Sequence, residues 1–223
     1  MVKYDFLHEE EGERAKETAL ELNYKAVNHY TGLAPYLREK IRRDASEIIA
    51  AYNTTHGTAY NLYKDRLILT TTLNADMQRY AEAAVKEHMK KLQHEFYTHW
   101  ENREPWYNKP QVLEQAIQNS PVYLSLKGQG YNEKQIAEIM NRKKAMMVYS
   151  AYQGEASAEM SSIDSLKHYL KILHPGMIAV EPNSGKIRVW IGDLDYKYFQ
   201  YDQVEAPRQV GSVFKPVVYS AAI

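Results

Sequence analysis

The sequence predicts an α+β protein in which a helix-rich region with one strand precedes a region that contains a β-hairpin. Apolar residues recur at helical spacing over most of the first 175 residues. One β-branched run, RLILTTTL at residues 66–73, interrupts that pattern. After residue 176, two short extended runs flank a loop that contains glycine, which is typical of a β-hairpin.

Composition limits the functional classes. The 223 residues contain 28 Lys and Arg against 28 Asp and Glu, so the chain lacks the basic excess of a nucleic-acid binder. It contains no cysteine, which excludes disulfides, thiolate nucleophiles and thiolate metal sites. No run approaches the roughly 18 apolar residues of a membrane span, and the first residues lack the apolar stretch of a signal peptide. We therefore expect any membrane anchor to lie outside this sequence.

The first predicted helix begins at Pro35, because proline suits the first turn of a helix and apolar residues follow at helical spacing. These apolar residues are Leu37, Ile41, Ala45, Ile48 and Ile49. The helix also carries four basic residues, Arg38, Lys40, Arg42 and Arg43. A patch for an anionic partner is one interpretation, but acidic residues interleave with the basic ones, so we favour a solvated face.

The strand expected at 66–73 leads into a long second helix. Asn74 can cap that helix, and apolar residues recur from Met77 towards Trp100. Residues 101–110 hold two prolines and no periodicity, so we expect a connector in which Trp106 fills a groove.

Three short helices are expected between residues 120 and 173. Ser120 and Pro121 start the first, Asn132 can cap a second that runs through Met147, and Ser162 can cap a third. The methionines of this region could form an adaptable binding surface, but we favour a role as core filler. They are Met140, Met146, Met147 and Met160. The predicted hairpin then pairs residues 177–180 with 186–191.

The strongest catalytic candidate is the S-x-x-K pair, Ser212 and Lys215. If Ser212 begins a helix, Lys215 returns to the same face about one turn later, where its amine can reach the serine oxygen. A serine hydroxyl is a poor nucleophile until a base takes its proton, and a desolvated lysine can be that base. The alternative is a helix cap followed by a surface lysine.

Three other patterns could indicate a metal site, paired catalytic carboxylates or a phosphate-binding loop, but we favour a structural role for each residue involved. His94 and His99 nearly form a zinc motif, but they lie five positions apart, so the two imidazoles point about 140° apart on a helix and we expect no metal. Asp193 and Asp195 could be paired carboxylates, but a polar turn after a strand is the simpler interpretation. No phosphate-binding glycine loop is present, and we expect no cofactor.

Several stretches together resemble the class A, or bifunctional, penicillin-binding proteins. The resemblance begins with HYTGLAPYLREKIR and continues with DRLILTTTLNADMQRYAEAAVKEHM and SSIDSLKHYL. It ends with the hairpin, VWIGDLDYKYF, RQVGSVFKP and VVYSAAI, and so covers the chain from about Leu22 to Ile223. In this resemblance, the long helical part is the interdomain linker and the last part is the start of a penicillin-binding transpeptidase domain of the serine β-lactamase type.

The resemblance implies a peptidoglycan synthase at the periplasmic face of the bacterial inner membrane, anchored through a helix outside this segment. Ser212 would be the nucleophile and Lys215 its proton acceptor. The implied ligands are the D-Ala-D-Ala end of a peptidoglycan stem peptide and the β-lactams that mimic it. Val213 stands where the family often has threonine.

Two further family motifs, S-x-N and K-[ST]-G, do not occur in the sequence, and neither does a glycosyltransferase domain. We therefore expect residues 1–60 to follow the missing glycosyltransferase domain, residues 61–175 to form the interdomain linker, and residues 176–223 to begin the transpeptidase domain. This piece alone would be inactive, and its unpaired hairpin would favour self-association.

Two functional classes remain open: part of a transpeptidase, or a noncatalytic interaction module of the cell-wall synthesis machinery. A penicillin sensor or β-lactamase shares S-x-x-K, but the long helical linker argues against it.

Overall fold

The computed structural model describes residues 2–17 and 29–222, which divide into two compact units. The first unit, Met1–Thr31, holds the short 3₁₀ helix η1 (Val2–Tyr4) and the helix α1 (Glu9–Glu17). Three glutamates lie in the first turn of α1, where they complement the positive end of the helix dipole. Neither element contains a buried residue, so this unit has no core of its own in the described part of the chain.

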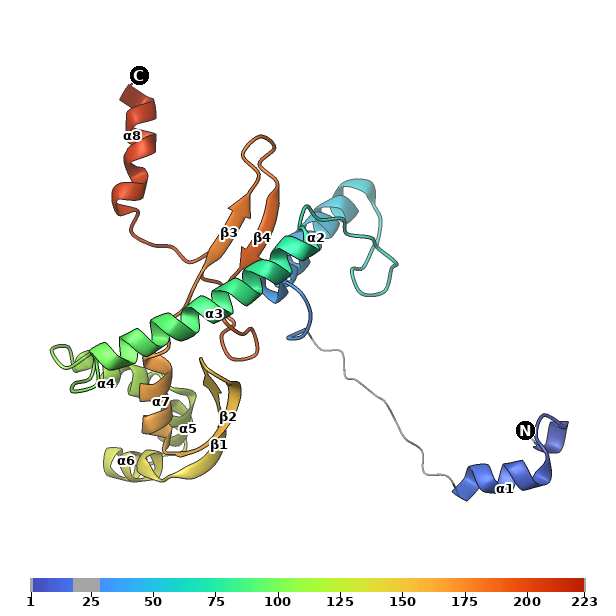
Figure 1. Ribbon diagram of the computed structural model, residues 1–223, viewed down its shortest axis with the longest axis horizontal. Coiled ribbons are helices and arrows are strands. Elements are labelled where there is room, and N and C mark those ends of the chain that lie inside the picture. Colours follow the sequence, from blue (N-terminus) through green and yellow to red (C-terminus); the bar gives the residue numbers. More distant parts are fainter. Residues whose placement is uncertain (1, 18–28, 223) are drawn as a thin grey trace. The chain divides into compact units, whose positions relative to one another are not determined.

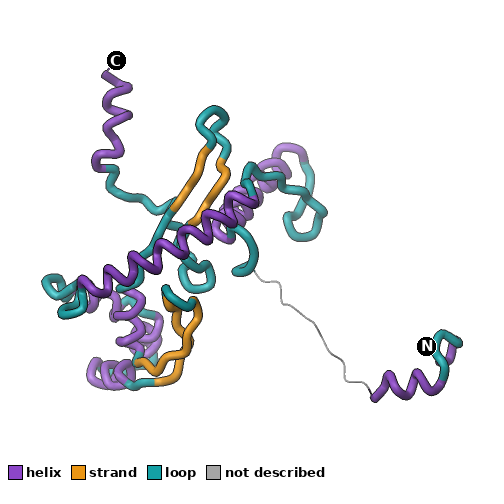
Figure 2. Tube along the Cα trace, in the orientation of Figure 1, coloured by secondary structure: helices purple, strands orange, loops and turns teal. Residues whose placement is uncertain are grey.

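The second unit, Gly32–Ile223, contains every other element (Figures 1 and 2). Its α-helices are α2 (Pro35–His56), α3 (Ala75–His99), α4 (Gln111–Gln118), α5 (Pro121–Gly128), α6 (Glu133–Asn141), α7 (Ser162–Leu170) and α8 (Lys215–Ala222), and η2 (Gly211–Phe214) is a 3₁₀ helix. Its strands are β1 (Lys144–Ser150), β2 (Gly154–Met160), β3 (Met177–Val180) and β4 (Ile187–Ile191). They form two antiparallel hairpins, β1–β2 and β3–β4. The α+β class is thus as the sequence predicts.

Helix α2 begins at Pro35 as predicted and ends at His56, because the left-handed backbone of the next residue, Gly57, terminates it. Tyr36, Leu37 and Ala45 are its buried residues. Tyr36 and Leu37 pack with Trp190 of β4, which joins α2 to the second hairpin.

The prediction of a strand over residues 66–73 is wrong, because this segment belongs to neither of the two described sheets. Only its end reaches β4, where the amide of Asn74 donates to the carbonyl of Arg188 at 3.1 Å and the Thr72 hydroxyl donates to the carbonyl of Ile187 at 2.8 Å. Ile68 is 91% exposed. A β-prone sequence forms a strand only where a partner completes its ladder, and this one has none along most of its length.

Helix α3 has the predicted cap, since the Asn74 side chain accepts hydrogen bonds from the amides of Asp76 and Met77. Its buried face is not purely apolar, because it holds Gln78 and Gln93 as well as Ala81 and Met89. Ala81 packs with Val189 and Ile191, so α3 covers one face of the β3–β4 hairpin.

The side chains of Gln78 and Gln93 each form two hydrogen bonds with backbone groups of another segment. The amide nitrogen of Gln78 donates to the Trp190 carbonyl at 2.9 Å, and the Trp190 amide donates to the Gln78 oxygen at 2.8 Å. In the same way, the Gln93 nitrogen donates to the Lys171 carbonyl at 2.8 Å and the Leu173 amide donates back at 2.9 Å. Two points 15 residues apart on α3 are thus each fixed by paired hydrogen bonds, one to β4 and one to the segment after α7.

The part of the chain from α4 to α7, residues 111–170, forms a separate group of short helices around the β1–β2 hairpin, here called the α4–α7 body. Its core contains Tyr123, Ile136 and Met140. Ser120 and Asn132 cap helices as predicted. The third cap is Ser161, one residue before the predicted Ser162.

The β1–β2 hairpin corrects the prediction that a helix runs through Met147. Helix α6 ends at Asn141, and Met147 lies in β1 opposite Ser157 of β2. Alanine, methionine and glutamate are good helix formers, so local propensity concealed strands that are stabilised by pairing with each other.

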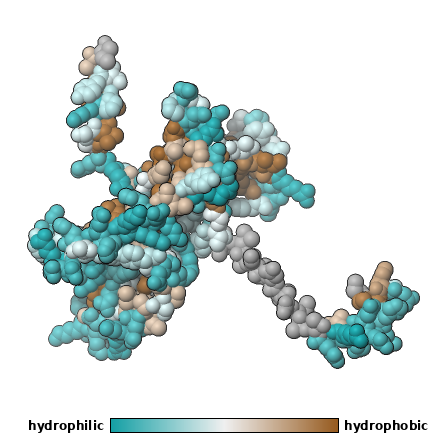
Figure 3. Space-filling model, in the orientation of Figure 1, coloured by the Kyte–Doolittle hydropathy of each residue, from teal (hydrophilic) through white to brown (hydrophobic). Residues whose placement is uncertain are grey.

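The β3–β4 hairpin confirms the predicted strands, with a register irregularity at Val180. Met177, Ile178 and Val180 of β3 remain 40–48% exposed. Figure 3 shows hydrophobic residues gathered over this hairpin.

Candidate functional site

The S-x-x-K pair lies at the junction of η2 and α8. Residues 211–214 form one 3₁₀ turn, and the amide of Lys215 donates to the carbonyl of Ser212, so the two residues are one turn apart as predicted. Both side chains are exposed. Within the described residues, no hydrogen bond joins the Ser212 hydroxyl or the Lys215 amine to another group, so the pair has the predicted spacing without an activating contact.

The loop that leads to the pair is folded. We call residues 192–205 the approach loop. The Gln203 amide donates to the Gly192 carbonyl at 2.8 Å, which closes the loop at its base. The Trp190 indole donates to Asp202 at 2.8 Å, and the other Asp202 oxygen accepts from the Val204 amide at 2.9 Å. The loop is therefore fixed to the end of β4.

Helix α2 holds the approach loop from another side. The Tyr36 hydroxyl donates to the carbonyl of Phe199 at 2.6 Å, and burial, reinforced by Asp193, raises the pKa of Tyr36. Glu205 accepts from Lys40 at 2.8 Å and from Arg43 at 2.7 Å. The basic residues of α2 are therefore neither a free anion site nor a purely solvated face, since two of them hold Glu205.

Gly192 is required where the loop leaves β4. A β-carbon at this position would lie 2.4 Å from the Tyr36 ring, and the ring cannot yield easily because it is buried. Only glycine allows the backbone to pass this close.

The two aspartates after β4 play different parts. Asp195 closes a turn as predicted, with its carbonyl accepting from the amides of Tyr198 and Phe199. Asp193 is buried, and one carboxylate oxygen lies 2.7 Å from the His174 Nδ1. Sequence reasoning missed this His–Asp contact because the residues lie 19 positions apart on either side of the hairpin.

The remaining candidates do not form a site. His94 and His99 are exposed on α3, and the described residues contain no cluster of three or more His, Asp or Glu side chains that could hold a metal. Met140 is core as predicted, whereas Met147 is 53% exposed. Trp106 is buried as expected.

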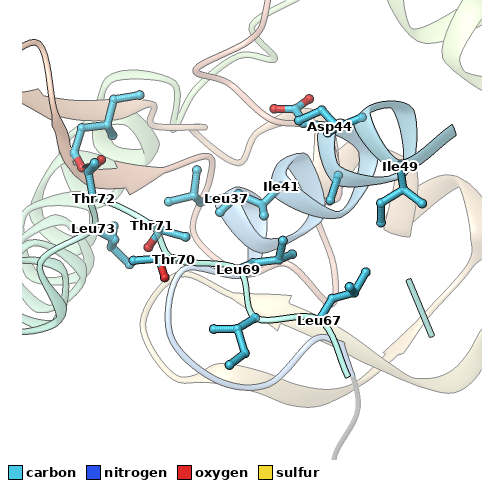
Figure 4. Close-up of a pocket in the computed structure, with 14 residues that line it drawn as sticks. Leu37, Ile41, Asp44, Ile49, Leu67, Leu69, Thr70, Thr71, Thr72 and Leu73 are labelled. Carbon is cyan, nitrogen blue, oxygen red and sulfur yellow. Dashed lines mark hydrogen bonds between the residues drawn. The ribbon is translucent and has the colours of Figure 1, made fainter. Parts of the chain in front are cut away.

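An apolar groove of about 510 Å³ lies between α2 and the extended segment 67–73 (Figure 4). Leu37 and Ile41 of α2 face Leu69 and Leu73 across it. Asp44 is its one titratable lining residue, so the groove has apolar surface but no pair of groups for acid–base catalysis. Among the described residues, no helix is long and apolar enough to cross a membrane.

Comparisons with known proteins point to one family. Residues 99–173 match the model of the penicillin-binding protein middle domain. The chain is 25% identical over 178 residues to penicillin-binding protein 1A of Aquifex aeolicus, a match that covers 72% of this chain and 23% of that protein. It is 20% identical over 268 aligned positions to penicillin-binding protein 1A of Escherichia coli, covering 100% of this chain and 29% of that protein. The chain thus spans about a quarter of the length of these curated relatives. No solved structure matches it significantly.

Proposed function

We propose that the chain is part of a class A penicillin-binding protein, as its similarity to the middle-domain model and to two penicillin-binding proteins 1A supports. On that premise, its full-length polypeptide is a peptidoglycan synthase whose transpeptidase is acylated at Ser212. The observation that supports this role is the position of Ser212 and Lys215 one helical turn apart, in the segment that follows the approach loop, which α2 and β4 hold. The polypeptide would act at the periplasmic face of the bacterial inner membrane.

The proposed chemistry is an acyl transfer through serine. The Ser212 Oγ attacks the carbonyl carbon of the penultimate D-alanine of a stem peptide while the Lys215 amine takes the hydroxyl proton. The terminal D-alanine leaves after its nitrogen receives that proton, and an acyl-serine ester remains. An amine of a second stem peptide then displaces the serine oxygen, which forms the crosslink and restores the hydroxyl. A β-lactam opens its ring at the first step and stays attached.

Acylation needs more than the nucleophile. The exposed Ser212 lacks an oxyanion hole and a hydrogen bond to Lys215 in the described residues, and such preorganised donors supply much of the rate of acyl transfer. We therefore propose that the 223-residue chain is inert and that the missing groups come from S-x-N and K-[ST]-G motifs elsewhere in the full-length polypeptide.

A second candidate is a noncatalytic module that holds neighbouring domains at a fixed distance. The paired hydrogen bonds of Gln78 and Gln93 support it, because they fix α3 to two parts of the fold without using Ser212.

A fluorescent penicillin distinguishes the two candidates. We expect it to label the full-length polypeptide covalently, to fail on Ser212→Ala, and to leave the purified 223-residue chain unlabelled. Ser220→Ala is the matched control, since Ser220 lies on α8 and its hydroxyl only donates to the Pro216 carbonyl. Labelling that survives Ser212→Ala would overturn the assignment of the nucleophile, and a full-length polypeptide that is never labelled would favour the spacing module.

A further inference from the structure

We propose that the α4–α7 body positions the segment that carries the S-x-x-K pair, and that Phe199 of the approach loop is the positioning residue through which it does so. The proposal rests on the proposed function for its effect on acylation, but the contact itself does not depend on that function. In Figure 1 the approach loop is the first part of the stretch between β4 and α8.

The Phe199 ring lies in a socket of three aromatic rings. Its centroid is 5.0 Å from Tyr149 of β1 and 6.0 Å from Tyr169 of α7, both in edge-to-face geometry. The third ring, His174, follows α7 and lies 4.8 Å away, also edge-to-face. Edge-to-face pairs at these distances are favourable beyond the area that they bury. The socket therefore belongs to the α4–α7 body and its outgoing segment, while the ring that fills it belongs to the approach loop.

The socket is held rigid within the α4–α7 body. Hydrogen bonds hold both backbone groups of Tyr149. Its amide donates to the Tyr169 hydroxyl at 3.2 Å, and its carbonyl lies 2.7 Å from the His168 Nε2. Tyr149 is buried, and burial raises the pKa of its hydroxyl to about 12. Two separate hydrogen bonds from α7 thus fix the residue against which Phe199 packs.

A second contact joins the same two parts. Glu155 of β2 accepts hydrogen bonds from the Lys197 amine and the Tyr198 hydroxyl, each at 2.7 Å, and these bonds lower the pKa of Glu155. Both donors directly precede Phe199 in the chain. Because Lys197 and Glu155 are exposed, these bonds add little to the free energy of unfolding, and their main effect is to orient the approach loop against β2.

The opposite side of Phe199 is held by the Tyr36 hydrogen bond to its carbonyl. Phe199 therefore connects the α4–α7 body through its ring to α2 through its backbone. The last long-range ion pairs of the approach loop are at Glu205, seven residues before Ser212. The contacts on both sides of Phe199 thus act together with those of Glu205 to set the position from which the chain continues towards Ser212.

Phe199→Leu tests the contact, since leucine keeps apolar volume but cannot make the edge-to-face contacts. The matched control is Phe96→Leu, which removes an aromatic ring that contacts Tyr97 and Trp100 rather than the approach loop. We measure amide hydrogen exchange in the 223-residue chain. Exchange at Phe199 and Gln203, whose amides bond within the loop, should rise at least about tenfold in Phe199→Leu, and should stay unchanged in Phe96→Leu.

The full-length polypeptide gives the second measurement. We expect Phe199→Leu to lower the first-order acylation rate constant about tenfold or more with little change in the concentration of penicillin that gives half the maximal rate, because a displaced nucleophile reacts slowly without losing ligand contacts. Phe96→Leu should leave both values unchanged.

Each outcome has a distinct meaning. Unchanged exchange in Phe199→Leu would overturn the contact, and faster exchange with an unchanged acylation rate constant would overturn its positioning role. If the wild-type full-length polypeptide is not acylated at Ser212, the proposed function fails, while the exchange measurement still decides whether the α4–α7 body holds the loop.

Discussion

Replacing Gln78 by methionine tests whether buried hydrogen bonds, rather than packing, join α3 to β4. Gln78 is 1% exposed, and its side chain satisfies both the amide and the carbonyl of Trp190, which is itself buried. Methionine has a similar length and flexibility, so the cavity term is small. It leaves two buried backbone groups without partners, each costing about 1–3 kcal/mol. We therefore expect the free energy of unfolding to fall by about 2–6 kcal/mol.

The assay is urea unfolding of the purified chain, followed by the fluorescence of its tryptophans, because Trp190 lies at the affected site. The matched control is Gln115→Met, since Gln115 is exposed on α4 and makes no side-chain hydrogen bond among the described residues. It should change the free energy of unfolding by less than about 0.5 kcal/mol. A loss below about 1 kcal/mol in Gln78→Met, or equal losses in both variants, would refute the reasoning.

Three further predictions concern charge and assembly. Lys215→Arg should abolish penicillin labelling of the full-length polypeptide as fully as Lys215→Ala, because arginine does not release its proton near neutral pH; near-normal labelling would show that only the charge matters. Hydrogen bonds from Lys40 and Arg43 hold the pKa of Glu205 below its usual 4.5, so its contribution to stability is present above pH 4.5 and is lost as the pH falls through the lowered value. Tm curves of wild type and Glu205→Gln should therefore differ near neutral pH and converge in acid, and a constant difference at every pH would contradict this. The exposed edge of β3 should drive concentration-dependent association that Ile178→Lys suppresses, and sedimentation of the wild type as a monomer at high concentration would count against it.

Local signals in the sequence predicted the elements that depend on neighbouring residues. Asn74 caps α3 and Pro35 opens α2 because their effects act within one turn. The β3–β4 hairpin was predicted because a short glycine-containing loop brings its own partner strand. The spacing of Ser212 and Lys215 follows from helical geometry alone.

Features that depend on distant contacts were missed. The sequence of residues 66–73 is strand-like, but its backbone finds no ladder partner, whereas β1 and β2 form from helix-prone residues because they pair with each other. Gln78 and Gln93 lie on the buried face of α3, at helical spacing with Ala81 and Met89. That spacing was the available signal, but the pattern of apolar residues that predicted α3 does not include glutamine. The socket of Phe199 joins residues up to 50 positions apart, which no local pattern reports.

The two glutamine contacts on α3 require a fixed number of residues between them. Gln93 lies 15 positions after Gln78, which corresponds to a rise of about 22 Å and a turn of about 60° beyond four full rotations. One inserted residue between them would move one contact about 1.5 Å along the axis and swing it by about 100°, so that one glutamine would face solvent. In natural variants, insertions and deletions should therefore fall in the connectors at residues 57–73 and 101–110 and spare the interior of α3. If a library of insertion and deletion variants were selected for folded chains and sequenced, the surviving sequences should keep the same number of residues between Gln78 and Gln93. Selection would then act on the length of this part of α3.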